Sequence, residues 1–122
     1  MKQFYQAISA LAGGRVFAFV APADAVYPLM VYTPIEVAGV MTIDGLQGLS
    51  RARMQVDAYA KVYTEAMALQ DQVIEALSAA DTTLVDVRMG PNEFDEDALA
   101  YRVSVDYSFY VQAPPDSLGL NA

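Results

Sequence analysis

Charged side chains alternate with apolar ones in two stretches of the chain, and these residues are the first candidates for chemistry. One stretch carries Arg51, Arg53 and Asp57, and the other carries Arg102 and Asp106. Two carboxylates can perform acid–base catalysis when they flank a reacting group. Each carboxylate shares its stretch with arginines, however, so ion pairing between neighbouring strands is the simpler expectation. A charged sheet surface open to water or to another subunit follows from this pattern.

The acidic run at residues 93–97 is a second candidate. Its carboxylates are suitable ligands for Ca²⁺, but the run lacks the spacing and the closing glutamate of an EF-hand loop. An acidic, solvated loop is therefore expected there. The chain has no cysteine and no histidine, which removes disulfides, thiolate ligands and the most common general base. We expect no catalytic residue, no metal site and no cofactor.

The charge of the chain is large and uneven. Seven Lys and Arg stand against fifteen Asp and Glu, for a net charge of −8. Residues 1–61 hold five basic and four acidic side chains, whereas residues 62–122 hold two basic and eleven acidic ones. Binding to a phosphate backbone needs clustered Lys and Arg, so nucleic-acid binding is not expected. No apolar run approaches the roughly 20 residues of a membrane span, so no membrane partner is expected either.

The charged stretches must be positioned by strands, because their apolar residues recur at every second position. In residues 51–59 four apolar side chains share one face, and the charged side chains share the other. Residues 101–111 show the same alternation over a longer run. From Thr64 to Leu77 the apolar residues recur at helical spacing, which predicts an amphipathic helix capped by Thr64.

Three segments before this unit are expected to complete its core. Residues 4–11 carry apolar side chains at helical spacing, and Gly13-Gly14 supplies the backbone that ends a short helix. Residues 15–20 alternate as a strand with apolar side chains on both faces. Residues 29–37 alternate as a further strand, in which Pro34 requires an edge position or a bulge because it has no N–H to donate.

The remaining segments are expected to be connections. Residues 38–49 contain three glycines and predict an extended hairpin arm or a mobile loop. A short strand at residues 84–87 is followed by a predicted turn at Gly90-Pro91-Asn92. Residues 114–122 follow the strand at 101–111 as a flexible tail.

The order of these elements is helix, strand, strand, strand, helix, strand, strand. It predicts an α+β fold, with a mostly antiparallel sheet of four to five strands and two helices packed on one face. At 122 residues the chain is expected to form a single domain over residues 1–113.

Four stretches in this order resemble a known family. They read VFAFVAP at residues 16–22, YPLMVY at 27–32, LSRARMQVDAYA at 49–60 and YRVSVDY at 101–107. Together with the helix after Tyr63, they are similar to the small tail-completion proteins of long-tailed bacteriophages and prophages, also called tail terminators or head–tail joining proteins. The resemblance covers roughly residues 3–112. It departs from common members only in Leu29-Met30, where a second aromatic residue often follows the proline.

The resemblance implies a structural virion protein without enzymatic activity. It implies a ring, usually of six copies, that ends the tail tube and meets the head connector or stopper protein, while DNA passes through without specific binding. The location would be the tail–head junction of the virion, after assembly in the cytoplasm of the bacterial host. Candidate contacts with a second subunit or the tail tube are Arg51, Arg53, Asp57, Arg102, Asp106, Thr42, Asp44 and Leu46. The alternative function is a small monomeric α+β module that binds a protein or a ligand.

Overall fold

The computed structural model describes residues 2–42, 45–79 and 82–111. The elements follow the predicted order. They are α1 (Lys2–Ile8), the 3-10 helix η1 (Leu11–Gly14), β1 (Val16–Ala18), β2 (Leu29–Thr42), β3 (Gly45–Ala60), α2 (Tyr63–Ala79), β4 (Thr82–Asp95) and β5 (Ala100–Val111).

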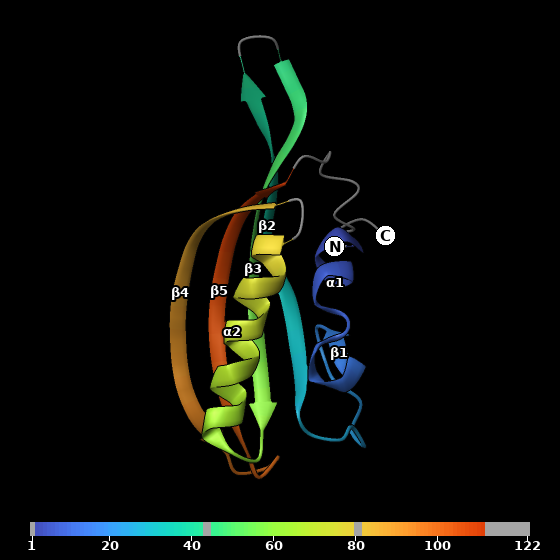
Figure 1. Ribbon diagram of the computed structural model, residues 1–122, viewed down its shortest axis with the longest axis vertical. Helices are drawn as coiled ribbons and strands as arrows, with labels where there is room; N and C mark the ends of the chain where they lie inside the picture. Colours follow the sequence, from blue (N-terminus) through green and yellow to red (C-terminus); the bar gives the residue numbers. More distant parts are fainter. Residues whose placement is uncertain (1, 43–44, 80–81, 112–122) are drawn as a thin grey trace.

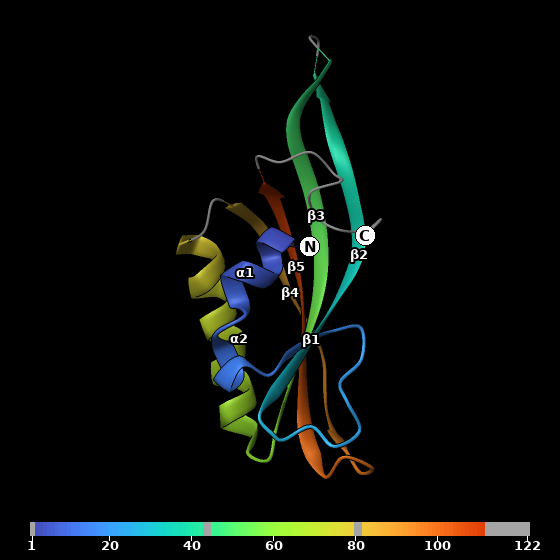
Figure 2. The same ribbon diagram turned by 90° about the vertical axis from the view of Figure 1, so that its right-hand side faces the viewer.

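The strands form a single sheet, and both helices lie on one face of it (Figures 1 and 2). The sheet has five strands in the order β1-β2-β3-β5-β4. β1 runs parallel to β2, whereas the pairs β2–β3, β3–β5 and β4–β5 are antiparallel. The predicted α+β class, with a mostly antiparallel sheet, is confirmed.

The hydrophobic core lies between the helices and the sheet. The alternation at residues 51–59 reports this correctly, because Ala52, Met54, Val56 and Ala58 are all 0% exposed. Burying a side chain of the size of Val or Met stabilises a fold by about 1.5–3 kcal/mol. The core partners of β3 are Phe4 and Ile8 of α1, Ala66, Leu69, Val73 and Leu77 of α2, and Val103, Val105, Tyr107 and Phe109 of β5.

One polar residue of α2 lies inside this core. Gln70 is 3% exposed, and its Nε2 donates to the carbonyl oxygens of Val56 and Val103, both at 2.8 Å. Its Oε1 accepts a hydrogen bond from the Tyr107 hydroxyl at 2.6 Å. Burial, together with the negative charge of Asp71, raises the pKa of Tyr107 well above its ordinary value, so the phenol remains a donor. These bonds fix α2 over the two central strands.

Gln70→Leu should lower the free energy of unfolding by about 2–4 kcal/mol, because two strand carbonyls lose the hydrogen bond from the Gln70 amide and the Tyr107 hydroxyl keeps only the backbone carbonyl oxygen of residue 70 as acceptor. Urea denaturation followed by circular dichroism measures the difference. Gln72→Leu is the matched control, since Gln72 is exposed on the same helix, and its change should stay within about 0.5 kcal/mol. Equal losses in the two variants would contradict the role given to Gln70.

The alternation of β2 changes at Pro34. The register between β2 and β3 shifts between Pro34 and the position two residues later, so Ile35 is the extra residue of a bulge. The predicted bulge or edge position is confirmed, but the single period predicted through residue 37 is wrong. Beyond the bulge, Val37 packs against the core, whereas Val31 lies on the face opposite the helices beside Asp57.

The turn predicted at Gly90-Pro91-Asn92 is wrong, because β4 continues through it to Asp95. A register shift occurs at this point of an edge strand, where proline is tolerated despite its missing N–H. A Cβ added to Gly90 would lie 3.1 Å from the carbonyl oxygen of Ser104. The glycine therefore serves a close approach of β4 to β5 rather than a turn.

Two element boundaries also differ from the predicted ones. β1 ends at Ala18, because Phe19 has a φ of 67° that takes the backbone out of the strand. α2 begins at Tyr63, and the carbonyl oxygen of Val62 accepts from the amide of Ala66 at 3.3 Å. Thr64 therefore lies inside the first turn and is not the capping residue.

β2 and β3 project beyond the rest of the sheet as a hairpin (Figures 1 and 2). The ladder between β3 and β5 stops at Ser50, whereas the ladder between β2 and β3 continues to the pair Thr42 and Gly45. The predicted hairpin arm is thus present, and we call residues 39–42 and 45–49 the arm. Thr42 and Leu46 belong to it. Asp44 and the predicted tail at residues 114–122 lie outside the described residues.

Candidate functional site

The sheet face opposite the helices, the open face, carries a row of ion pairs. Their side chains are largely solvent-accessible, so each pair contributes only about 0–1 kcal/mol. The hydrogen bonds that Arg51 and Arg53 donate to their carboxylate partners raise the pKa of both guanidinium groups above the ordinary value. The pairs in the described part of the chain are Arg51–Glu36 at 2.9 Å, Arg53–Asp106 at 2.8 Å, Arg88–Asp86 at 2.7 Å and Arg102–Glu93.

The sequence-predicted charges are brought onto one face, but only two of them pair with each other. Arg53 of β3 reaches Asp106 of β5 as a diagonal neighbour, in agreement with cross-strand pairing. Arg51 and Arg102 instead bind glutamates of β2 and β4. Asp57 forms no ion pair among the described residues. The two carboxylates considered for acid–base work therefore have separate surroundings.

Sequence reasoning did not assign the two glutamates that complete this row. Glu36 follows the bulge in β2, and the bulge shifts it onto the open face opposite Arg53. The sequence predicts an acidic loop at Glu93, but this residue lies in β4 opposite Arg102. The acidic run is divided between strand and turn, and the Asp95 carboxylate accepts the amides of Asp97 and Ala98 at 3.0 and 3.1 Å.

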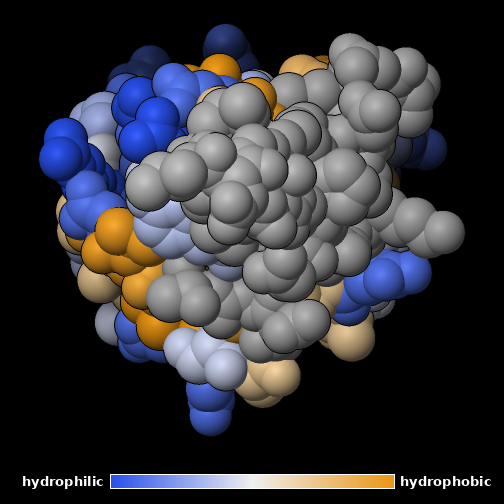
Figure 3. Space-filling view, turned by 90° about the horizontal axis from the view of Figure 1, so that it is seen from above, coloured by the Kyte–Doolittle hydropathy of each residue, from blue (hydrophilic) through white to orange (hydrophobic). Residues whose placement is uncertain are grey.

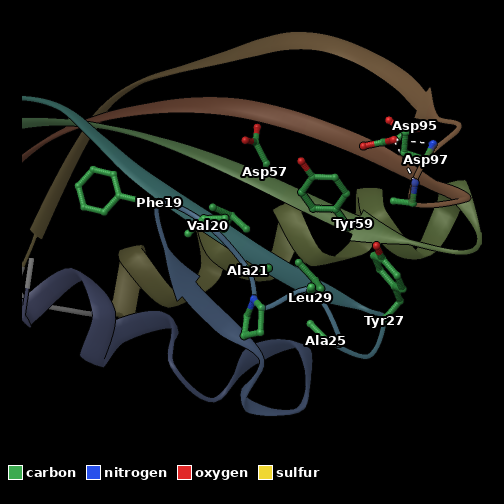
Figure 4. A pocket seen from close by; sticks show the side chains of 14 residues that line it. Phe19, Val20, Ala21, Ala25, Tyr27, Leu29, Asp57, Tyr59, Asp95 and Asp97 are labelled. Atoms are coloured by element: carbon green, nitrogen blue, oxygen red, sulfur yellow. Dashed lines mark hydrogen bonds between the residues drawn. The ribbon is translucent and has the colours of Figure 1, made fainter.

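A groove of about 490 Å³ opens at one end of the open face (Figure 4). Its floor is formed by side chains of β2 and β3, and its walls are the β1–β2 connection and the β4–β5 turn. We call it the open-face groove. Its lining residues are Phe19, Val20, Ala21, Pro22, Ala23, Ala25, Tyr27, Leu29, Val31, Asp57, Tyr59, Asp95, Asp97 and Ala98.

The groove exists because the β1–β2 connection, residues 19–28, turns over the open face (Figure 2). This connection covers Leu29 and Val31, which are 3% and 7% exposed although they point away from the helices. Asp57 projects from β3 into the same space and is 9% exposed. The face expected to be open to water or to another subunit is therefore partly buried at this end by the chain itself.

Lys61 joins the two walls of the open-face groove. Its Nζ donates to the carbonyl oxygens of Ala98 and Leu99 at 3.2 and 3.1 Å, in the β4–β5 turn. The same nitrogen lies 4.6 Å from the centre of the Tyr27 ring, in the β1–β2 connection. Nearby, burial raises the pKa of Tyr59, and a hydrogen bond from Arg102 opposes that shift. Lys61 thus links the β1–β2 connection to the β4–β5 turn.

A second surface feature is an apolar flank on β4. Val87, Met89 and Phe94 face the helix side of the sheet, but α2 does not extend over them and they remain exposed. Seen from the arm end, hydrophobic side chains reach the surface on the side of the molecule where β4 lies (Figure 3). Among the described strands, β4 lies at an edge of the sheet and pairs with β5.

Other classes of site are not found in residues 2–42, 45–79 and 82–111. No group of three or more acidic side chains gathers there as a metal ion requires. None of the helices described has the length and hydrophobicity of a membrane-spanning segment.

Comparison with known proteins finds a matching family and similar solved structures. A family model described as Tail completion protein gp17 matches residues 5–112. A chain in the solved structure "Virion of native gene transfer agent (GTA) particle" superimposes with a TM-score of 0.63 at 20% identity, over 90% of this chain and 92% of that chain. No curated protein matches the sequence. The structural match shows a shared fold, and the family match extends from α1 to the end of β5.

Proposed function

The chain belongs to the Tail completion protein gp17 family and is a structural tail protein, and from that premise we propose that its copies form a ring that ends the tail tube. The ring joins the tube to the head connector or stopper protein, at the junction of tail and head. The observation that carries the proposal is the family match over residues 5–112.

The two edges of the sheet, formed by β4 and β1, support head-to-tail assembly of identical copies. At one edge, β4 carries the apolar flank of Val87, Met89 and Phe94. At the other edge, the short strand β1 pairs with β2 at Met30, Val31 and Tyr32. The two edges differ in shape, so a contact between them is heterologous. Such contacts generate a ring when the rotation that relates neighbouring subunits closes on itself.

The charges of the open face support passage of DNA without specific binding. Each arginine on the described part of this face is paired with a carboxylate of the same chain. Binding to phosphates depends on Lys and Arg side chains that release counterions from the backbone. Paired arginines within a chain of net charge −8 provide little of that attraction.

The arm supports a separate contact with the tail tube. Its residues pair only with each other in the described ladders, because β5 does not reach them. Backbone that extends past the neighbouring strand β5 in the described ladders is well placed to contact a partner. We assign the tube contact to the arm, with Thr42 and Leu46 within it, and the subunit contacts to the sheet and its edges.

The ring is tested by size and by assembly. The purified chain alone should form a species near six times 13.2 kDa. When it is added to isolated tail tubes, electron microscopy should show a ring at the end of each tube. Deleting its gene in the bacterium that makes the particles should yield heads without tails and tubes of uncontrolled length by electron microscopy. Normal particles from the deletion strain would refute the proposal. So would tubes that are capped by a single copy of the chain.

A further inference from the structure

Asp57 is a buried carboxylate whose bonding is incomplete within the described chain. It is 9% exposed, and its hydrogen-bond partner is the Gln55 side-chain amide, at 3.3 and 3.4 Å from its two oxygens. An ionised carboxylate has about four acceptor sites, and buried charges are normally paired. In Figure 4 its side chain lies in the open-face groove beside Tyr59. The carboxylate thus presents unused acceptor capacity to the groove.

No Lys or Arg side chain in residues 4–38, 51–79 and 84–110 is available to fill this capacity. Four arginines of the open face bind carboxylates, as described above. Arg15 donates from Nε to the carbonyl oxygen of Pro28 at 2.8 Å, and Lys61 is held by Ala98 and Leu99. A second copy of the chain therefore brings no unengaged Arg or Lys from residues 4–38, 51–79 and 84–110. This favours a different protein, rather than a second copy, as the source of the complementary charge.

The shape and lining of the open-face groove favour an arginine side chain. The groove, at about 490 Å³, falls within the range of about 300–1,000 Å³ that holds small ligands. A guanidinium binds a carboxylate with two parallel hydrogen bonds and stacks on aromatic rings, which Tyr27 and Tyr59 supply. Its aliphatic stem can lie along apolar side chains, and Phe19 and Val20 are exposed beside the groove.

We propose that the open-face groove binds an extended segment of another protein, which places one arginine on the Asp57 carboxylate. Apolar residues next to that arginine lie on Phe19 and Val20. Asp97 at the rim adds to the negative potential that the arginine meets. This site goes beyond the proposed ring, because it uses neither the edge of β4 nor the arm.

A peptide pair tests the proposal on the unmodified full-length protein. The probe is acetyl-Leu-Arg-Leu-amide, and its control carries citrulline, which keeps the shape of arginine without the charge. In a titration followed by amide NMR, the arginine peptide should shift the resonances of Tyr27, Asp57 and Tyr59 saturably. The citrulline peptide should bind about tenfold more weakly, since it lacks the charge that the carboxylate recognises. Equal affinities, or shifts elsewhere only, would overturn the proposal.

Two variants locate the recognition on Asp57. Asp57→Asn should abolish the preference for arginine over citrulline, whereas Asp71→Asn, the same change on an exposed position of α2, should retain it. If Asp57→Asn does not fold, the peptide pair on the unmodified protein decides alone. Groove resonances that shift with protein concentration in the absence of peptide would instead identify a second copy as the occupant and refute the proposal.

Discussion

Val56→Asp should leave most of the chain unfolded at room temperature. Val56 is 0% exposed and lies beneath α2, where its carbonyl oxygen accepts a hydrogen bond from the Gln70 side-chain amide. The substitution removes about 1.5–3 kcal/mol of apolar burial and adds an unpaired buried carboxylate. Such a charge costs several kcal/mol even after relaxation, against a total stability of about 5–15 kcal/mol for a typical domain. Far-ultraviolet circular dichroism during urea titration measures the result.

Val62→Asp is the matched control for this prediction. Val62 is 54% exposed and directly precedes α2, where its carbonyl accepts the amide of Ala66. Aspartate is favoured at that capping position, so stability should stay equal or rise by about 0.5–1 kcal/mol. If Val56→Asp were as stable as Val62→Asp, the assignment of the inner face of β3 would be wrong.

Removal of residues 40–49 should abolish tail completion while leaving the fold intact. The deletion cuts away almost the entire arm and leaves Ala38 paired with Arg51 across a Gly39–Ser50 connection. Gly followed by another residue suits a two-residue type II′ hairpin turn. The described ladders of β5 and β1 do not involve the removed residues, so the unfolding free energy should change by less than about 1 kcal/mol. Particle assembly should fail, because the assigned tube contact is gone.

Complementation of the gene-deletion strain measures this effect. The shortened chain should give uncapped tubes under the electron microscope, whereas the full-length gene restores joined particles. The purified shortened chain should keep its melting temperature and its oligomeric size, which separates loss of the tube contact from loss of the ring. Full assembly with the shortened chain would show that the tube is contacted elsewhere.

The periodicity of the sequence was enough to predict the core accurately. The alternation at 51–59 and 101–111 and the helical spacing at 66–77 each gave the buried face, because a strand or helix with one apolar face must bury that face. Some errors concerned the boundaries of β1 and α2, and the others fell where a strand carries an irregularity. The bulge after Pro34 and the shift around Pro91 change the register, and local sequence does not distinguish such a bulge from a turn.

The candidate site was only partly predictable for the same reason. The charges on alternating strand positions indicated one charged face, and Arg53 with Asp106 are indeed joined across it. The partners Glu36 and Glu93 were missed, because each depends on the pairing of strands that bulges alter. Asp57 was expected among the surface charges, and its burial depends on a connection that returns over the sheet from β1.

The sequence by itself determined the secondary structure order, the inner faces of the two central strands and of α2, and the absence of cysteine and histidine chemistry. Those features depend on neighbours a few residues apart, where the type of each side chain decides the outcome. Only the tertiary structure decided which charges meet, where the groove opens and how far the arm projects. These features depend on strand register and on contacts between residues far apart in the sequence, such as the β1–β2 connection that passes over Asp57. No local sequence pattern encodes them.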